Sequence, residues 1–363
     1  TNNSHKLFLN LGYEFNKGSY GYVWTLFDGH ITLNQEHMDY LRGRIDTTRN
    51  RTGLSMNMGS MTALNLNGGH QVSLNLGLDR TLPSLEQRID MRDDSDPMNI
   101  RIGNPQLRAT LTPSIKLNAT YRSKLTLHRF SWEYRTIYNA IAMGYVYDTH
   151  TGVRTYRPEN VNGNWNTTGE YTFHKDFGVA KKQNLDIPLS ATYSENVDLV
   201  GVDGAISPSL SRVHRLAISV APSFKADFGK QHFEITCQPT WERLTSERTD
   251  FTDFSALTSR TTLSATLKLP WQIDLNTDFS LYTRSGYADV RLNTTDWVWN
   301  ARLSRPFFKG SLLVMFDGFD ILGQLSNVTR TINAQGRTET FTSVMPRYAL
   351  LHVVYRFKKE PRK

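Results

Sequence analysis

Ionisable side chains on the polar positions of alternating segments are the best functional candidates in this sequence. The set is Lys116, Glu133, Arg135, Lys225, Asp227, Glu234, Glu242, Asp274, Asp278, Arg284 and Arg302. Charged groups gathered on one face pair with each other or meet a solute in a wet cavity. We therefore expect solute contacts here. Six of these residues are candidates for ligand binding: Lys116, Arg135, Asp274, Asp278, Arg284 and Arg302.

Motifs for catalysis and for cofactor binding are absent from the sequence. It contains no Gly-rich phosphate loop, no His-Glu-x-x-His and no Gly-x-Ser-x-Gly. The ten His residues are dispersed, and the lone Cys237 excludes an intramolecular disulfide or a Cys-based metal cluster. Asp90, Asp93, Asp94 and Asp96 offer oxygen ligands of the kind calcium prefers, but without EF-hand spacing, so we interpret them as a solvated loop. The sequence predicts no enzyme activity, no metal site and no cofactor.

Short segments with strict period-two alternation must position these side chains. In residues 72–79, Val72, Leu74, Leu76 and Leu78 share one face, and residues 273–284 alternate in the same way. This pattern predicts half-buried β-strands, and no segment has a convincing helical period. Comparable segments cover residues 5–15, 18–33, 51–65, 106–122, 127–139, 161–176, 184–194, 213–228, 231–243, 259–268, 296–306, 311–321 and 346–357.

The connections between these segments alternate in length. Tight connections, with the Gly and Asn that short hairpins need, lie near 16–18, 67–69, 122–124, 228–230, 269–270 and 308–310. Long polar connections lie near 34–50, 81–105, 140–160, 195–212, 244–258, 285–295 and 322–345. In outer-membrane barrels the short turns are periplasmic and the long loops extracellular. The sequence therefore predicts an all-β fold, an antiparallel transmembrane β-barrel of the bacterial outer membrane, surrounded by outer-membrane lipid.

Composition excludes two other classes of protein. No stretch of about 18 apolar residues exists, which excludes a helical membrane protein. The formal charge of +8 is spread over strands and loops, so we expect no nucleic-acid partner. The one dense basic run, residues 358–363, is expected to form a periplasmic tail after a barrel domain of residues 1–357. We expect interfacial aromatic girdles, with sugar contacts as the alternative, at Trp132, Tyr134, Trp241, Trp271, Trp297 and Trp299.

The expected strand count is odd, at about 15 within a range of about 14–16, whereas bacterial single-chain barrels have even numbers. Counted back from Phe357, the segment 5–15 would also run toward the periplasm. The sequence also opens at Thr1 with no signal peptide. We therefore expect that N-terminal strands are missing and that residues 5–15 do not pair with 346–357. Pro188, Pro222 and Pro239 fall inside strand patterns and predict bulges or weakened pairing.

Several motifs resemble Bacteroidetes outer-membrane proteins of the TonB-dependent receptor-like type. They are Pro83–Gln87, Asp96-Pro97, Gly103–Leu107, Tyr156–Trp165, Phe316–Leu322, Asn327–Arg330 and Arg347–Phe357, in an order and spacing similar to that family along nearly the whole chain. The resemblance implies the C-terminal portion of a barrel of about 22 strands. It also implies an N-terminal plug, uptake through the TonB system and, in sugar- and peptide-importing relatives, a surface lipoprotein partner.

Three hypotheses follow from the sequence. The first is a barrel for passage or uptake of a nutrient-sized solute. The second is a non-transporting outer-membrane scaffold or interaction barrel, completed by missing strands, a plug or another chain within a larger surface assembly. The third is a soluble, secreted all-β protein such as an adhesin, which would need no detergent.

Overall fold

Nearly all of the described chain is antiparallel β-structure. The computed structural model describes residues 2–16, 21–42, 45–178, 182–201, 208–248, 251–287, 290, 293–324, 328–333, 336–341 and 347–357. Within these residues no helix is both long enough and apolar enough to cross a membrane. The predicted tail at 358–363 lies outside the described residues.

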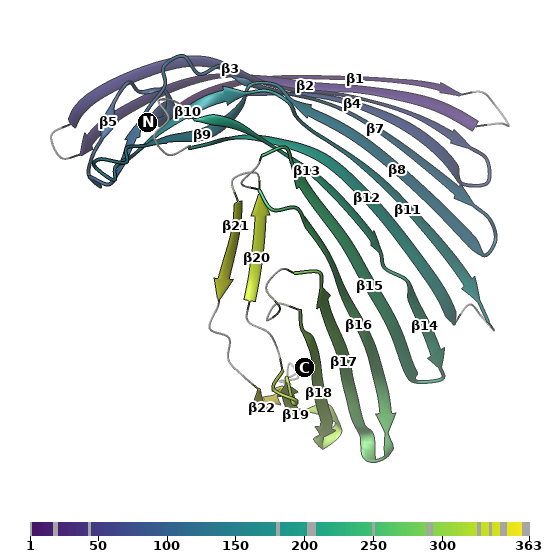
Figure 1. The fold of residues 1–363 in the computed structure, drawn as a ribbon. Helices are drawn as coiled ribbons and strands as arrows, with labels where there is room; N and C mark the ends of the chain where they lie inside the picture. Colours follow the sequence, from purple (N-terminus) through teal and green to yellow (C-terminus); the bar gives the residue numbers. More distant parts are fainter. Residues whose placement is uncertain are drawn as a thin grey trace.

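One curved sheet of 16 strands dominates the molecule (Figure 1). Its strands, given in chain order, are β1 (Asn2–Asn16), β2 (Gly21–Arg42), β3 (Ile45–Leu66), β4 (His70–Thr81), β7 (Thr110–Arg122), β8 (Thr126–Ile137), β11 (Asn164–Phe177), β12 (Gln183–Val200), β13 (Ser209–Val220), β14 (Ser223–Phe228), β15 (Gln231–Ser246), β16 (Phe254–Leu269), β17 (Ile273–Ser285), β18 (Thr295–Phe307), β19 (Leu312–Phe319) and β22 (Tyr348–Tyr355). Apart from β13 and β14, which both pair with β12 and β15, each strand pairs antiparallel with its neighbours along the chain, as expected for an up-and-down barrel wall.

The interruption between β13 and β14 explains three prolines that the sequence left without a clear role. Ala221 and Pro222 separate the two strands, and both strands pair with β12 and β15. Pro188 and Pro239 flank the same gap. The Ala221 amide donates to the Pro188 carbonyl at 2.9 Å, and the Cys237 amide donates to the Pro222 carbonyl at 3.0 Å. The predicted weakened pairing is therefore one local gap across three adjacent strands. With β13 and β14 taken as one interrupted strand, the sheet has the predicted 15 crossings.

Three predictions about the connections are wrong in detail. The connection expected at 34–50 is instead the end of a long hairpin, in which the pairing of β2 with β3 continues to Arg42 opposite Ile45. The loops expected at 195–212 and 244–258 are shorter than predicted, because β12 continues to Val200 and β16 begins at Phe254. In each case the polar residues that read as loop continue the strand pairing beyond the apolar band.

Three further long connections contain regular structure of their own. The connections after β4 and β8 contain α1 (Leu85–Arg88), β5 (Arg92–Asp93), β6 (Asn99–Ile102), β9 (Ala140–Tyr147) and β10 (Arg154–Val161). The four strands form a small sheet in the order β5-β6-β10-β9, and β6 and β10 run parallel. The connection after β19 contains the hairpin of β20 (Val328–Asn333) and β21 (Gly336–Phe341). Sequence alternation did not predict these elements because they are short and lie at the strand ends.

The edges of the large sheet do not meet. Among the described residues, β1 pairs only with β2, and β22 pairs only with β19. The pairing of residues 5–15 with 346–357 that a closed ring would need is absent there, as the sequence predicted. An unpaired strand edge in hydrocarbon costs several kcal/mol for each backbone group.

Candidate functional site

The register of the large sheet assigns every residue of a strand to one of two faces. Directly opposed residues in antiparallel strands share a face. Leu275 on β17 is opposite Leu267 and Leu303, whereas its neighbour Asn276 is opposite Thr266 and Arg302. We call the apolar side, which contains Leu275, the outer face and the polar side, which contains Asn276, the inner face.

The outer face has two belts of aromatic rings. Near the long connections, ring contacts link Tyr134 to Trp165 at 5.9 Å, Trp165 to Tyr193 at 5.4 Å and Tyr193 to His214 at 6.2 Å. Near the tight turns, rings of β4, β7, β8 and β11 make a second belt that includes the His70–Tyr121 stack at 4.6 Å. Exposed aliphatic side chains lie between the two belts, for example Leu263. Aromatic girdles on either side of an apolar band are typical of a transmembrane barrel.

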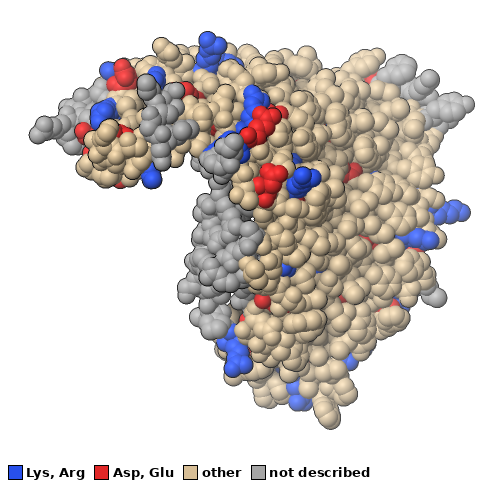
Figure 2. All heavy atoms as spheres, viewed as in Figure 1, with Lys and Arg blue, Asp and Glu red and all other residues tan. Residues whose placement is uncertain are grey.

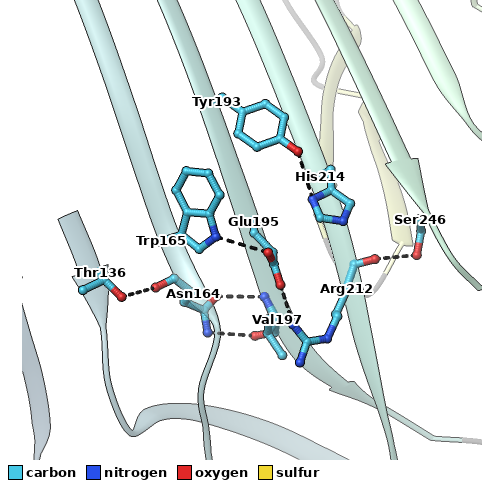
Figure 3. A network of polar contacts seen from close by, with 9 residues as sticks. All are labelled: Thr136, Asn164, Trp165, Tyr193, Glu195, Val197, Arg212, His214 and Ser246. Carbon is cyan, nitrogen blue, oxygen red and sulfur yellow. Dashed lines mark hydrogen bonds and ion pairs between the residues drawn. The ribbon is translucent and has the colours of Figure 1, made fainter. Parts of the chain in front are cut away.

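Charged side chains on the outer face are confined to the ends of the strands. At the aromatic belt near the long connections, Arg212 donates to the Glu195 carboxylate at 2.5 Å, and the Trp165 indole donates to the same carboxylate at 3.1 Å (Figure 3). The Asn164 side chain bonds both backbone groups of Val197 and so extends the pairing of β11 with β12. In the space-filling view, charged side chains likewise gather toward the two ends of the strands (Figure 2). The predicted girdle residues Trp132, Tyr134, Trp241, Trp297 and Trp299 all lie on the outer face, and Trp271 lies in a turn.

All six candidate ligand residues lie on the inner face, but they form separate groups. Lys116 on β7 and Arg135 on β8 both reach Glu133, at 3.4 Å each. The other four candidates lie on β17 and β18, several strands away in the sheet order. The sequence therefore predicted the face correctly and could not show this division.

A first hollow of roughly 600 Å³ opens on the inner face over β8, β11, β12 and β13. Arg135 and Arg215 stand on its two sides, with Asn166 and Ser194 between them. Arg215 pairs with the Glu242 carboxylate of β15. Sequence reasoning missed Arg215, although it occupies a polar position of the 213–228 segment.

A second hollow of roughly 360 Å³ lies over β16, β17, β18 and β19. It brings together the candidates Asp278 and Arg302. The Asn300 side chain donates to Asp278 at 2.9 Å, and Arg302 makes a bidentate contact with Asp317. The Asp317 side chain is only 2% exposed and also meets His352 at 2.9 Å. Asp317 lies within the Phe316–Leu322 motif, but its partners across the sheet could not be read from the sequence.

Three of the candidates, Lys116, Asp274 and Arg284, do not line these hollows. Asp274 pairs with Lys268 at 2.6 Å next to the turn that joins β16 and β17. Arg284 lies at the other end of β17, opposite Thr258. Carboxylates and cations of the inner face thus lie in neighbouring pairs, which suits a water-filled space. Over the described residues, no cluster of His, Cys, Asp or Glu has the arrangement of a metal site.

The long connections contain acidic groups whose roles are structural. In the small sheet, the Asp96 carboxylate accepts hydrogen bonds from the Asn99 side chain and the Met98 amide, which lower its pKa. Asp93 accepts from the Ser95 amide at 3.1 Å. These carboxylates stabilise turns.

Fold and face assignment together define the wall of an outer-membrane β-barrel. The model of the outer membrane protein beta-barrel family matches residues 60–355. The chain therefore belongs to this family, and its location is the bacterial outer membrane. No curated protein and no solved structure matches the chain.

Proposed function

We propose that this chain forms the wall of a pathway through which a nutrient-sized polar solute crosses the outer membrane. The observation that carries the proposal is the inner face, where paired charged groups flank two hollows lined by amides and hydroxyls. A scaffold that only had to fill or seal its interior would not need open polar hollows on that face. The chain's role in this proposal is to bind and guide a solute, without enzyme chemistry.

The resemblance to Bacteroidetes TonB-dependent receptors adds a source of energy and a set of partners to the proposal. In this form of the proposal, strands from outside residues 1–363 complete the ring and a plug fills its interior. The TonB system then drives uptake. A surface lipoprotein is a further expected partner. The unpaired edges of β1 and β22 support the need for additional strands, since edges exposed to lipid are not stable.

Solute uptake by cells that express the whole protein tests this function. Radiolabelled polar solutes of different size should enter expressing cells faster than cells that lack the protein, and removing TonB should abolish the difference. Equal uptake in both strains for every solute would contradict a transport role. Uptake that persists without TonB would support passive passage and reject the energised form.

A second candidate is an interaction barrel, favoured by the small sheet of β5, β6, β9 and β10 and by α1. This part presents folded structure at the loop ends of the strands, where a partner at the cell surface could dock (Figure 1). Replacing residues 85–102 with a short Gly-Ser linker distinguishes the two functions. Loss of co-purifying surface proteins with unchanged solute uptake would favour the interaction role.

A further inference from the structure

The first hollow has a regular construction across four strands. Arg135 on β8 is directly opposite Asn166 on β11, Asn166 is opposite Ser194 on β12, and Ser194 is opposite Arg215 on β13. Adjacent strands lie about 4.8 Å apart, so the Cα atoms of the two arginines are separated by about 14 Å. Two long cationic side chains thus stand on either side of a floor of small hydrogen-bonding side chains.

Each arginine is held in place by a carboxylate and still has donors to offer. Arg215 uses its Nε for Glu242, and Arg135 approaches Glu133 through one terminal nitrogen at 3.4 Å. Their side chains are 40% and 48% exposed. A guanidinium has five N–H donors in a fixed fork, so each arginine can donate to a second acidic group facing the hollow.

Acidic side chains also lie in and near the lining of the hollow. Two carboxylates line it: the Oδ1 of Asp198 accepts from the Leu199 amide at 2.8 Å, and Glu195, on the outer face by register, accepts from Arg212 and the Trp165 indole. Glu133 and Glu242 are each paired with a cation and are not among the lining residues of the hollow. On the inner face the guanidinium, amide and hydroxyl donors lie opposite one another on four strands, and Asp198 is the carboxylate of that face among the lining residues.

We propose that the first hollow is a binding site for an elongated solute that carries a carboxylate toward each end and hydroxyl or amide groups between them. Each carboxylate contacts one arginine, and the middle of the solute hydrogen-bonds Asn166 and Ser194. Arginine suits this role because its planar fork matches a carboxylate in a bidentate manner. This inference rests on the proposed passage of a solute along the inner face.

Binding of two matched pairs of probes to the full-length protein in detergent tests the charge requirement. The first pair is a galacturonic acid trimer and its fully methyl-esterified, uncharged form. The second pair is the peptide Glu-Ser-Glu, blocked at both ends, and the blocked peptide Gln-Ser-Gln. Calorimetry should detect at least one acidic probe and find its neutral counterpart weaker by about tenfold or more, since hydrogen bonds to charged groups contribute about 1.5–3 kcal/mol. Whether the sugar acid or the peptide acid binds tells which source of carboxylate the site takes. The proposal is overturned if neither acidic probe binds, or if each acidic probe binds with the same affinity as its neutral counterpart.

Substitutions on β8 and β13 then locate the site. Arg135→Gln and Arg215→Gln should each weaken the acidic probe by about tenfold, and the pair together by more. Arg129→Gln is the matched control, because Arg129 lies on the same face of β8, close to its other end, and outside the hollow. The double variant Arg135→Gln with Glu133→Gln keeps the local charge balanced, and it should still lose binding. An unchanged affinity in this double variant, or an equal loss in Arg129→Gln, would overturn the assignment.

Uptake of a neutral sugar keeps this inference separate from the proposed function. If the protein carries neutral solutes and the acidic probes show no preference, only the assignment of the hollow fails. If no solute of any kind is taken up, the transport function itself fails, and binding of the acidic probes can still be measured on the purified protein.

Discussion

The outer and inner faces of β16 differ completely although they share one backbone. On the outer face, Leu263 lies between Ile235 and Phe279 of the neighbouring strands. One residue further, Ser264 lies on the inner face between Glu234 and Asp278. Both residues belong to one strand and are paired with the same two neighbouring strands. The contrast shows that the side chains alone decide which side of the wall meets lipid and which side meets water.

The largest expected effect comes from placing a cation on the wrong face. Leu263→Arg should reduce the folded, membrane-inserted fraction, because an arginine at mid-depth on the lipid face costs roughly 2–4 kcal/mol. Ser264→Arg is the matched control one residue away, and its new cation would lie between two carboxylates. Protease resistance of the barrel in isolated outer membranes measures the folded fraction. If Ser264→Arg proves the more damaging change, the two faces are assigned the wrong way round.

An arginine at Leu275 tests how the cost of a lipid-facing cation depends on its depth in the membrane. Leu275 lies on the outer face, but close to the turn that joins β16 and β17. The penalty for a lipid-facing cation falls to about 0–1 kcal/mol near the interface, so Leu275→Arg should be much milder than Leu263→Arg. Equal damage at both positions would mean that the membrane band extends over the turn.

A smaller effect is expected from breaking an ion pair on the inner face. Arg302→Gln leaves the buried Asp317 carboxylate with His352 as its remaining charged partner. An unsatisfied buried acceptor costs about 1–3 kcal/mol, so the urea midpoint of unfolding should fall. Arg305→Gln, on the outer face of the same strand and stacked on Phe307 at 4.8 Å, should change the midpoint less. Adding Asp317→Asn to Arg302→Gln should restore part of the loss, and a further loss instead would contradict the pairing.

The face of each strand residue followed directly from the sequence because a strand has a period of two. Residues 72–79 and 273–284 showed it without any structural information, and every candidate ligand residue lies on the face predicted for it. The tight turns were also readable, since Gly68, Gly69 and Gly229 have the positive φ that short hairpins require. The face of a strand residue and the position of a tight turn depend on a few neighbouring residues, so a local sequence pattern can predict both.

Contacts between distant strands could not be read in this way. The first hollow depends on Arg135 and Arg215 lining the same hollow from either side of β11 and β12, which requires the register of three strand pairs. Pro188, Pro222 and Pro239 were visible one at a time, but their shared gap appears only when the strands are aligned. The small sheet was missed because β5 and β6 are too short to show alternation.

The smallest expected effect concerns a turn in the long connection between β9 and β10, away from both faces of the wall. The Asp148 carboxylate accepts hydrogen bonds from the Thr151 hydroxyl at 2.8 Å and the His150 amide at 2.9 Å, and these bonds lower its pKa. Because the pKa is lower in the folded turn than in the unfolded chain, the turn is stabilised at neutral pH. That stabilisation is lost as the pH falls through the lowered pKa. Thr151→Val removes the larger cause and should bring the Asp148 pKa back toward its ordinary value, measured by NMR titration of ¹³C-labelled aspartate with Asp148→Asn as the assignment control. The wall should stay protease-resistant throughout, since the turn makes no contact that the barrel strands need; an Asp148 that titrates at its ordinary value in the unchanged protein would show that the turn is not formed.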